Sequence, residues 1–157
     1  MGIIDLIHAL QDKSSNVRLT AAEALGNIGQ GAKDAVPALI QALQDEIEYV
    51  RYYAAEALGN IGQDAVDAVP ALIQALQDPS EYVRLTATSA LDQMGKDAVP
   101  SLIRALQDKD VCYYAAEALG NIGQDAKDAL PALNHALQDQ SEYVRRQAAK
   151  ALSEISN

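Results

Sequence analysis

Tyrosine is the residue type in this sequence that is best suited to molecular recognition. The chain has seven Tyr and no Trp or Phe. Tyrosine offers a large contact area with few rotatable bonds and a polar tip, as residues that anchor binding surfaces do. Acidic, amide and basic side chains recur beside the tyrosines. Together they predict one partner-binding surface, formed by Tyr52, Tyr53, Glu56, Asn60, Tyr82, Tyr113, Tyr114, Glu117, Asn121, Tyr143 and Arg146.

A structural role for some of these tyrosines is the alternative. Tyr49, Tyr82 and Tyr143 occupy one shared position in a repeated turn. Packing between the turns, over the ridge of the repeats, would explain this position without any partner. The adjacent pairs Tyr52–Tyr53 and Tyr113–Tyr114 lie outside that turn, so they are the stronger candidates for contact with a partner.

The sequence has no recognisable catalytic or metal-binding constellation. His8 and His135 lie in opposite terminal repeats, so they cannot share a metal ion, and no Cys/His cluster exists. Glu56 and Glu117 are too far apart in a linear stack for paired acid–base chemistry, and we expect both to be solvated. No Gly-rich phosphate loop or nucleophile motif is present. We therefore predict a protein that is not an enzyme and has no catalytic residue, metal or cofactor.

Cys112 is the single cysteine, and we expect it in the first turn of a helix. A helix N-terminus can lower the pKa of a thiol and make it reactive. The simpler interpretation is drift at a position where the other repeats have arginine. A single cysteine also excludes an internal disulfide and is typical of a reducing compartment.

One repeated segment positions these side chains. The sequence VRYYAAEALGNIGQDA, residues 50–65, returns almost unchanged at residues 111–126, and looser copies begin at Val17, Val83 and Val144. Each copy has apolar residues at helical spacing, and its glycines lie near the end of the predicted helix. A unit this short cannot bury its own apolar face, so stacked copies must share a core.

A shorter helix is predicted before each copy. In the form VPALIQALQD its proline lies in the first turn, where a missing N–H costs least. No segment resembles a strand, so the fold class is all-α. We predict a single domain over residues 1–157, built from helix pairs at approximately residues 3–35, 36–68, 69–98, 99–129 and 130–157.

The recurring pattern VP-x-LI-x-AL-x-D, four residues, then VR-x-x-AA-x-AL-G-x-IG resembles a HEAT-like repeat. The resemblance is to the short bacterial kind, also called phycobilisome-lyase HEAT-like repeats, and it covers nearly the whole chain. It implies a right-handed α-solenoid (α-α superhelix) of five helix pairs, in which the second helix of each pair, here called the B helix, lines the concave face. The first helix of each pair is called the A helix.

The resemblance also implies a hydrogen-bonded ladder between neighbouring repeats. Asp45 and Arg51 are one predicted pair of this ladder. Cys112 occupies the arginine position of the fourth repeat, where the ladder should be broken. The residues implied are Asp12, Asp45, Asp78, Asp108 and Asp139 with Arg18, Arg51, Arg84 and Arg145.

Repeats three and four depart from the pattern. Successive prolines are 33 residues apart from Pro37 to Pro70 but 30 apart from Pro70 to Pro100, because a three-residue link replaces a six-residue one. Asp92 also replaces a recurrent glycine, and Met94 replaces an isoleucine. We predict an irregular junction between these two repeats.

The two ends of the repeat array differ in polarity. Repeat five has Asn134, Lys150 and Ser153 where other repeats have mainly apolar, acidic or glycine residues, and a polar outer face is what a terminal cap requires. The segment Ile3–Ile7 is mostly apolar instead. Either this exposed side is tolerated, or it packs against more chain or another subunit, so self-association through the first repeat is a prediction.

Charge limits the partners. Twelve basic and twenty-two acidic residues give a net charge of −10, whereas nucleic-acid binding needs a basic groove. The N-terminal sequence lacks the basic region and long apolar core of a signal peptide, and no apolar run approaches the ~20 residues of a membrane span. We therefore predict a soluble cytoplasmic protein without nucleic-acid or membrane partners.

The favoured function is a non-catalytic protein–protein interaction scaffold. Its Tyr-lined acidic concave face would bind a protein or peptide of basic or mixed charge. The alternative, implied by the resemblance, is a bilin lyase subunit or a phycobilisome-associated chromophore-handling helper. The near-identity of repeats two and four also fits an excised segment or an engineered array.

Overall fold

The chain folds into helices only. The computed structural model describes residues 1–157 and contains ten α-helices, four 3₁₀ segments and no strand. In chain order the elements are α1 (Ile3–Ala9), α2 (Ser15–Ile28), η1 (Gly29–Ala35), α3 (Val36–Ala42), α4 (Glu48–Ile61), η2 (Gly62–Ala68), α5 (Val69–Ala75), α6 (Glu81–Met94), η3 (Gly95–Ala98), α7 (Val99–Ala105), α8 (Cys112–Ile122), η4 (Gly123–Ala129), α9 (Leu130–Ala136) and α10 (Glu142–Ser156).

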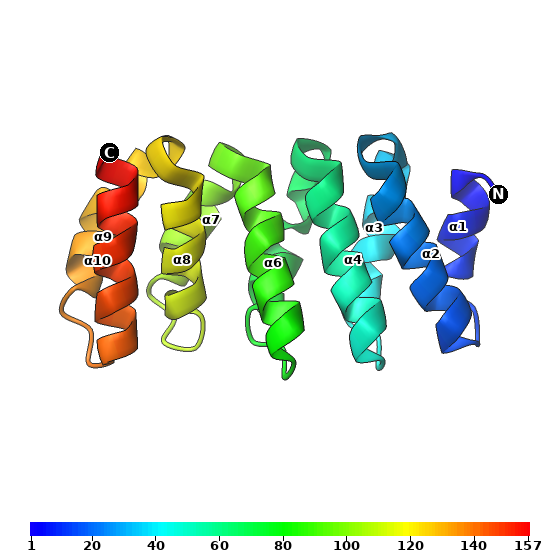
Figure 1. The fold of residues 1–157 in the computed structure, drawn as a ribbon, viewed down its shortest axis with the longest axis horizontal. Helices are drawn as coiled ribbons and strands as arrows, with labels where there is room; N and C mark the ends of the chain where they lie inside the picture. The colour runs from blue at the N-terminus through cyan, green and yellow to red at the C-terminus, as the bar shows by residue number, and fades with distance from the viewer.

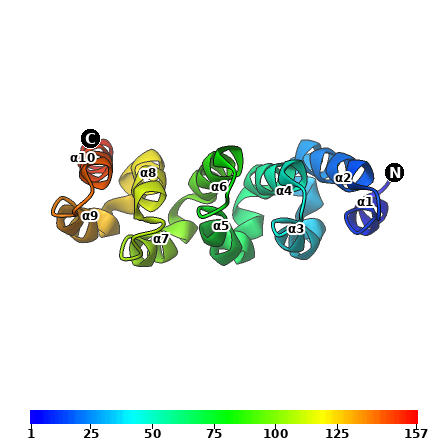
Figure 2. The same ribbon diagram turned by 90° about the horizontal axis from the view of Figure 1, so that it is seen from below.

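The helices pair into an elongated α-solenoid, with the two termini at opposite ends (Figure 1). The odd-numbered A helices form one row and the even-numbered B helices form the other (Figure 2). Each B helix packs against its own A helix and against the next B helix. The predicted fold class, an all-α solenoid of five helix pairs, is therefore confirmed.

Proline and glycine set the helix boundaries. Helices α3, α5, α7 and α9 each have proline at one of their first two positions, as predicted. Four B helices end at a glycine with positive φ, for example Gly62 at 76°. The links after these glycines form 3₁₀ segments, and η2 is kinked at Ala65, whose φ and ψ are not helical. Ala65 and Ala68 are both buried, so this link packs against the core.

The core is a double row of leucines. Leu25, Leu58, Leu91 and Leu119 occupy equivalent positions in four B helices and are fully buried. The A helices contribute a second row of fully buried residues: Leu39, Leu72, Leu102 and Leu133. Each leucine lies between its own repeat and its neighbour, so the repeats share one continuous core, as stacked short repeats must.

Glycine in the B helices permits close approach of the next B helix. A Cβ atom added to Gly59 would lie 3.0 Å from the Cα atom of Ala90, and one added to Gly120 would lie 3.0 Å from that of Ala151. Asp92 occupies this glycine position in α6. Helices α6 and α8 accordingly pack less extensively than the other neighbouring B helices, so the irregular junction between repeats three and four is present.

The ends carry the predicted difference in polarity. Ile4 of α1 is 70% exposed, while Asn134, Lys150 and Ser153 lie exposed in the last repeat. Self-association through the first repeat stays a prediction. None of the helices is long and apolar enough to cross a membrane.

Candidate partner-binding face

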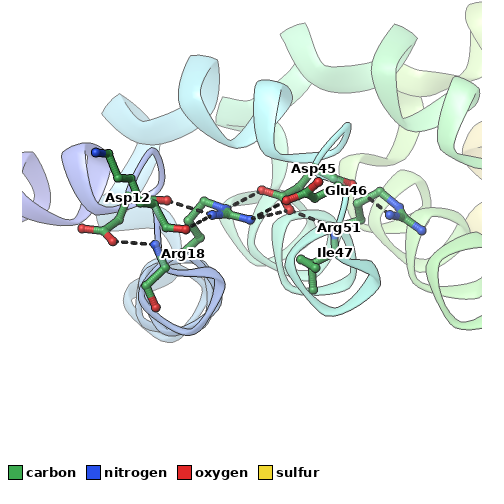
Figure 3. A network of polar contacts seen from close by, with 8 residues as sticks. Asp12, Arg18, Asp45, Glu46, Ile47 and Arg51 are labelled. Atoms are coloured by element: carbon green, nitrogen blue, oxygen red, sulfur yellow. Dashed lines mark hydrogen bonds and ion pairs between the residues drawn. The ribbon is translucent and has the colours of Figure 1, made fainter.

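A ladder of arginine and aspartate fixes the turn end of the B helices (Figure 3). The Arg18 guanidinium donates to both carboxylate oxygens of Asp45, at 2.7 and 3.2 Å. Arg51 donates to Asp78 in the same way, at 2.7 and 3.1 Å. Burial alone would raise the pKa of Asp45, but hydrogen bonds from Arg18 and the Ile47 N–H lower it below its usual value. Both ion pairs are bidentate and largely buried, so they fix neighbouring repeats relative to each other.

The ladder differs from its predicted pairing. Asp45 and Arg51 do not form an ion pair, because the Arg51 side chain donates to the Asp45 backbone carbonyl at 2.8 Å. The carboxylate of Asp45 is instead occupied by the arginine of the preceding repeat. Arg18 and Arg51 therefore each link two repeats: each donates to a backbone carbonyl of its own turn and to the carboxylate of the next turn.

The ladder is broken over a longer stretch than predicted. Cys112 leaves Asp139 without an arginine, as expected, but Arg84 also fails to reach Asp108. Arg84 donates instead to the Tyr114 hydroxyl at 3.0 Å, and its guanidinium lies 5.7 Å from the centre of that ring. The turn that carries Asp108 is two residues shorter than the others, which explains the lost contact. Tyr114 thus has a structural contact that its sequence position did not indicate.

The remaining tyrosines divide into two groups. Tyr52 and Tyr53 pack edge to face with ring centres 5.1 Å apart, and Tyr113 and Tyr114 repeat this geometry. Burial and nearby carboxylates raise the pKa of Tyr53 and Tyr113. The second group, at the start of the B helices, is 60 to 73% exposed, so these rings do not pack over the ridge between repeats: Tyr49, Tyr82 and Tyr143.

A pocket of about 270 Å³ lies between α4 and α6. Three predicted site residues, Tyr52, Glu56 and Asn60, line it from α4. Leu85 and Ser89 line it from α6, and sequence reasoning missed both. A usable signal was present, because α6 has leucine and serine where α4 has Tyr52 and Glu56. Shorter side chains in one of two adjacent helices leave space between them.

Several other predicted site residues are engaged within the chain. The Asn60 side chain donates to the Gly26 carbonyl at 3.1 Å, and that of Asn121 donates to the Asp92 carboxylate at 3.0 Å. Arg146 pairs with Glu142 at 2.7 Å within exposed α10. Both asparagines therefore join adjacent B helices, although both residues remain exposed.

Carboxylates converge where α6, α8 and α10 meet. Asp92, Glu117 and Glu154 each have one buried oxygen without a hydrogen-bond partner. Burial raises the pKa of Asp92 to about 7, against the opposing hydrogen bond from Asn121. Burial also raises the pKa of Glu117, while Lys150 opposes the shift. Glu117 is therefore only partly solvated, not fully as expected, because one of its carboxylate oxygens is buried. No three His, Cys, Asp or Glu side chains are arranged to hold a metal ion.

Cys112 is not activated by its helix. Its side chain is 2% exposed, and burial raises the pKa of the thiol. A reactive thiolate needs the opposite shift together with solvent access. Burial thus favours the simpler interpretation of Cys112, drift at a position where other repeats have arginine.

The sequence matches the family described as HEAT repeats over residues 3–69, 36–113 and 107–157. The chain belongs to the HEAT repeat family. Among solved structures, this HEAT repeat chain is similar to one from the complex of CpcE and CpcF of phycocyanin lyase from Nostoc sp. PCC7120, with 32% identity and a TM-score of 0.68. The match covers 99% of this chain and 65% of that one, so the chain spans less than two thirds of its relative.

A designed armadillo repeat protein and an engineered protein are also similar. A designed armadillo repeat protein in complex with the peptide (KR)4 is 25% identical with a TM-score of 0.61, over 96% of this HEAT repeat chain and 80% of that chain. An engineered protein solved by a structural genomics consortium is 26% identical with a TM-score of 0.62, over 99% and 79% of the two chains. No curated protein sequence matches this chain.

Proposed function

We propose that this HEAT repeat protein is a non-catalytic scaffold that binds an extended, basic segment of a protein partner along its B helices. The contact surface comprises the exposed parts of Tyr52, Tyr53, Glu56, Tyr82 and Tyr113. Rigid aromatic side chains supply contact area at low entropic cost, and the carboxylates attract a basic partner.

The distribution of charge on the B helices carries this proposal. Helices α2, α4, α6 and α8 contain three basic residues in total, Arg18, Arg51 and Arg84. All three donate hydrogen bonds at the turn end of their helices, so none competes for a ligand on the helix face. Acidic side chains and tyrosines are left facing solvent there. The designed armadillo repeat protein with its bound (KR)4 peptide supports a partner of the same chemistry.

A role as a lyase subunit or chromophore-handling helper is the second candidate. It is favoured by the 32% identity to a chain of the phycocyanin lyase complex. Pocket size does not separate the two candidates: the pocket between α4 and α6 has about 270 Å³, whereas one of about 560 Å³, lined by Tyr113, Tyr114 and Tyr143, lies within the ~300–1,000 Å³ usual for small-molecule sites. Titration with a free bilin, followed by absorbance, distinguishes the two functions.

Binding of a labelled (KR)4 peptide at low ionic strength tests the proposal. We expect saturable binding that weakens as salt rises, because screening reduces attraction between exposed charges. Replacing Tyr53 and Tyr113 together by alanine should weaken binding at least about ten-fold, in line with ~2 kcal/mol or more per aromatic anchor. A matched control variant replaces Gln41 and Gln74, which are exposed on the A helices, by alanine. It should bind the peptide like the parent protein. Absence of saturable binding, or equal losses in both variants, would overturn the proposal.

A further inference from the structure

We infer that the pocket between α4 and α6 is the subsite that receives one lysine or arginine side chain of the bound segment. This inference rests on the proposed function and adds a position to it. The pocket combines apolar walls with one free carboxylate, which is the chemistry that a long cationic side chain requires. Such side chains bury their aliphatic stem along apolar surface and keep the charged head among polar groups.

The walls of the pocket suit the aliphatic stem. The Tyr52 ring lies on one side and Leu85, which is 44% exposed, on the other. Gly59 and Ala90 form part of the lining, and the missing Cβ of Gly59 lets the two helices approach closely there. An aromatic face also attracts a cation directly, by about 0.5–1 kcal/mol at exposed sites.

Glu56 supplies the charge. None of the four ion pairs within the chain involves Glu56, so its carboxylate is available to a ligand. The Gln93 and Asn60 amides lie in the same lining, and Ser89 adds a hydroxyl. No basic residue of the chain lines the pocket. An incoming ammonium or guanidinium group therefore meets one carboxylate and neutral acceptors, without a competing cation.

The subsite is specific to this pair of repeats. In α6 the positions equivalent to Tyr52, Tyr53 and Glu56 are Leu85, Thr86 and Ser89, whereas α8 returns to Tyr, Tyr and Glu. The space exists because the α6 side chains are shorter, although they follow the same helical register. The degeneracy of repeat three thus opens a pocket between α4 and α6 that a partner side chain can enter.

Two matched pairs of variants test the subsite, with the labelled (KR)4 peptide as the probe. Glu56→Gln removes the carboxylate from the pocket, and Asp67→Asn removes one carboxylate at an exposed position of η2, outside the B helices. Ser89→Phe fills the pocket, and Thr20→Phe adds the same ring on exposed α2. We expect the two pocket variants to weaken binding at least about five-fold and the two controls less than about two-fold. Circular dichroism verifies that all four variants keep their helices.

The outcomes separate this inference from the proposed function. If the parent protein binds the peptide and the pocket variants lose no more affinity than their controls, the subsite is wrong and the scaffold function stands. If the parent protein shows no saturable binding, the proposed function fails, and the subsite fails with it.

Discussion

Asp92 is the residue whose chemistry the fold changes most. It occupies a position where other B helices have glycine, so its carboxyl group is forced into the interface with α8. One of its oxygens accepts from Asn121 and the other has no partner. Glu117 and Glu154 add negative charge nearby, which also raises its pKa. A buried charge without full compensation destabilises the folded state, so Asp92 costs stability wherever it is ionised.

Replacing Asp92 by asparagine should therefore stabilise the protein at high pH. The pKa of Asp92 is about 7 in the folded state and close to 3.8 when unfolded, so the folded state binds more protons between these values. Its contribution to stability is present below pH 3.8 and is lost as pH rises to about 7. We expect Asp92→Asn to raise the free energy of unfolding by about 1–3 kcal/mol at pH 8. Urea denaturation should show this gain shrinking towards pH 5, and a gain independent of pH would contradict the assignment.

At the scale of elements, the junction of α6 with α8 is the least extensive contact between neighbouring B helices. The Asp92 side chain prevents the close approach that Gly59 and Gly120 permit elsewhere. The ladder is also missing there, since Arg84 bonds Tyr114 rather than a carboxylate. A bidentate ion pair has thus been replaced by one hydrogen bond to a neutral hydroxyl, which is the weaker interaction.

Amide exchange should locate this junction. In a solenoid, local stability depends on the interfaces between neighbouring repeats, so a weak interface opens more often. We expect amides of residues 92–98 to exchange faster than those of residues 59–68, which occupy the equivalent helix end and link between repeats two and three. Hydrogen–deuterium exchange with mass spectrometry resolves the two segments. Equal protection in both would mean that the smaller interface has no effect on local opening.

At the scale of the whole molecule, the repeats made the fold predictable. Five copies of one pattern, with proline and glycine at fixed positions, are enough to predict helix pairs and a shared core. The 3₁₀ segments were not predicted, because they are short, kinked at residues such as Ala65 and held to the core by buried alanines. The local sequence determines the helical spacing of apolar residues. Which residues become buried depends on the neighbouring repeat.

The candidate site was predictable only in part for the same reason. Tyr52 and Glu56 lie together in a pocket, but Tyr114 and Asn121 bond to the adjacent repeat. Such contacts depend on how repeats are offset, and the shortened turn before α8 changes that offset. The pocket exists because the side chains that face it from α6 are short. A search of the sequence for chemically active residue types does not reveal positions where short side chains leave space.

Charge is also unevenly distributed along the stack. Among the B helices, only α10 carries basic residues outside the ladder, Arg146 and Lys150, whereas α2 and α4 present Glu23 and Glu56. A bound segment should therefore place its basic residues over the first four repeats. Its neutral or acidic residues belong near the fifth.

A nuclear magnetic resonance footprint of the (KR)4 peptide on the labelled protein tests the central claim most directly. The scaffold function predicts that changes in amide chemical shift concentrate in the B helices α4, α6 and α8. The largest changes should occur at Leu85 and at the alanines that line the pocket together with Tyr52. Amides of the A helices α3, α5 and α7 should stay unchanged. Shifts confined to the A helices, or no shifts at saturating peptide, would contradict the assignment of the B helices as the binding face.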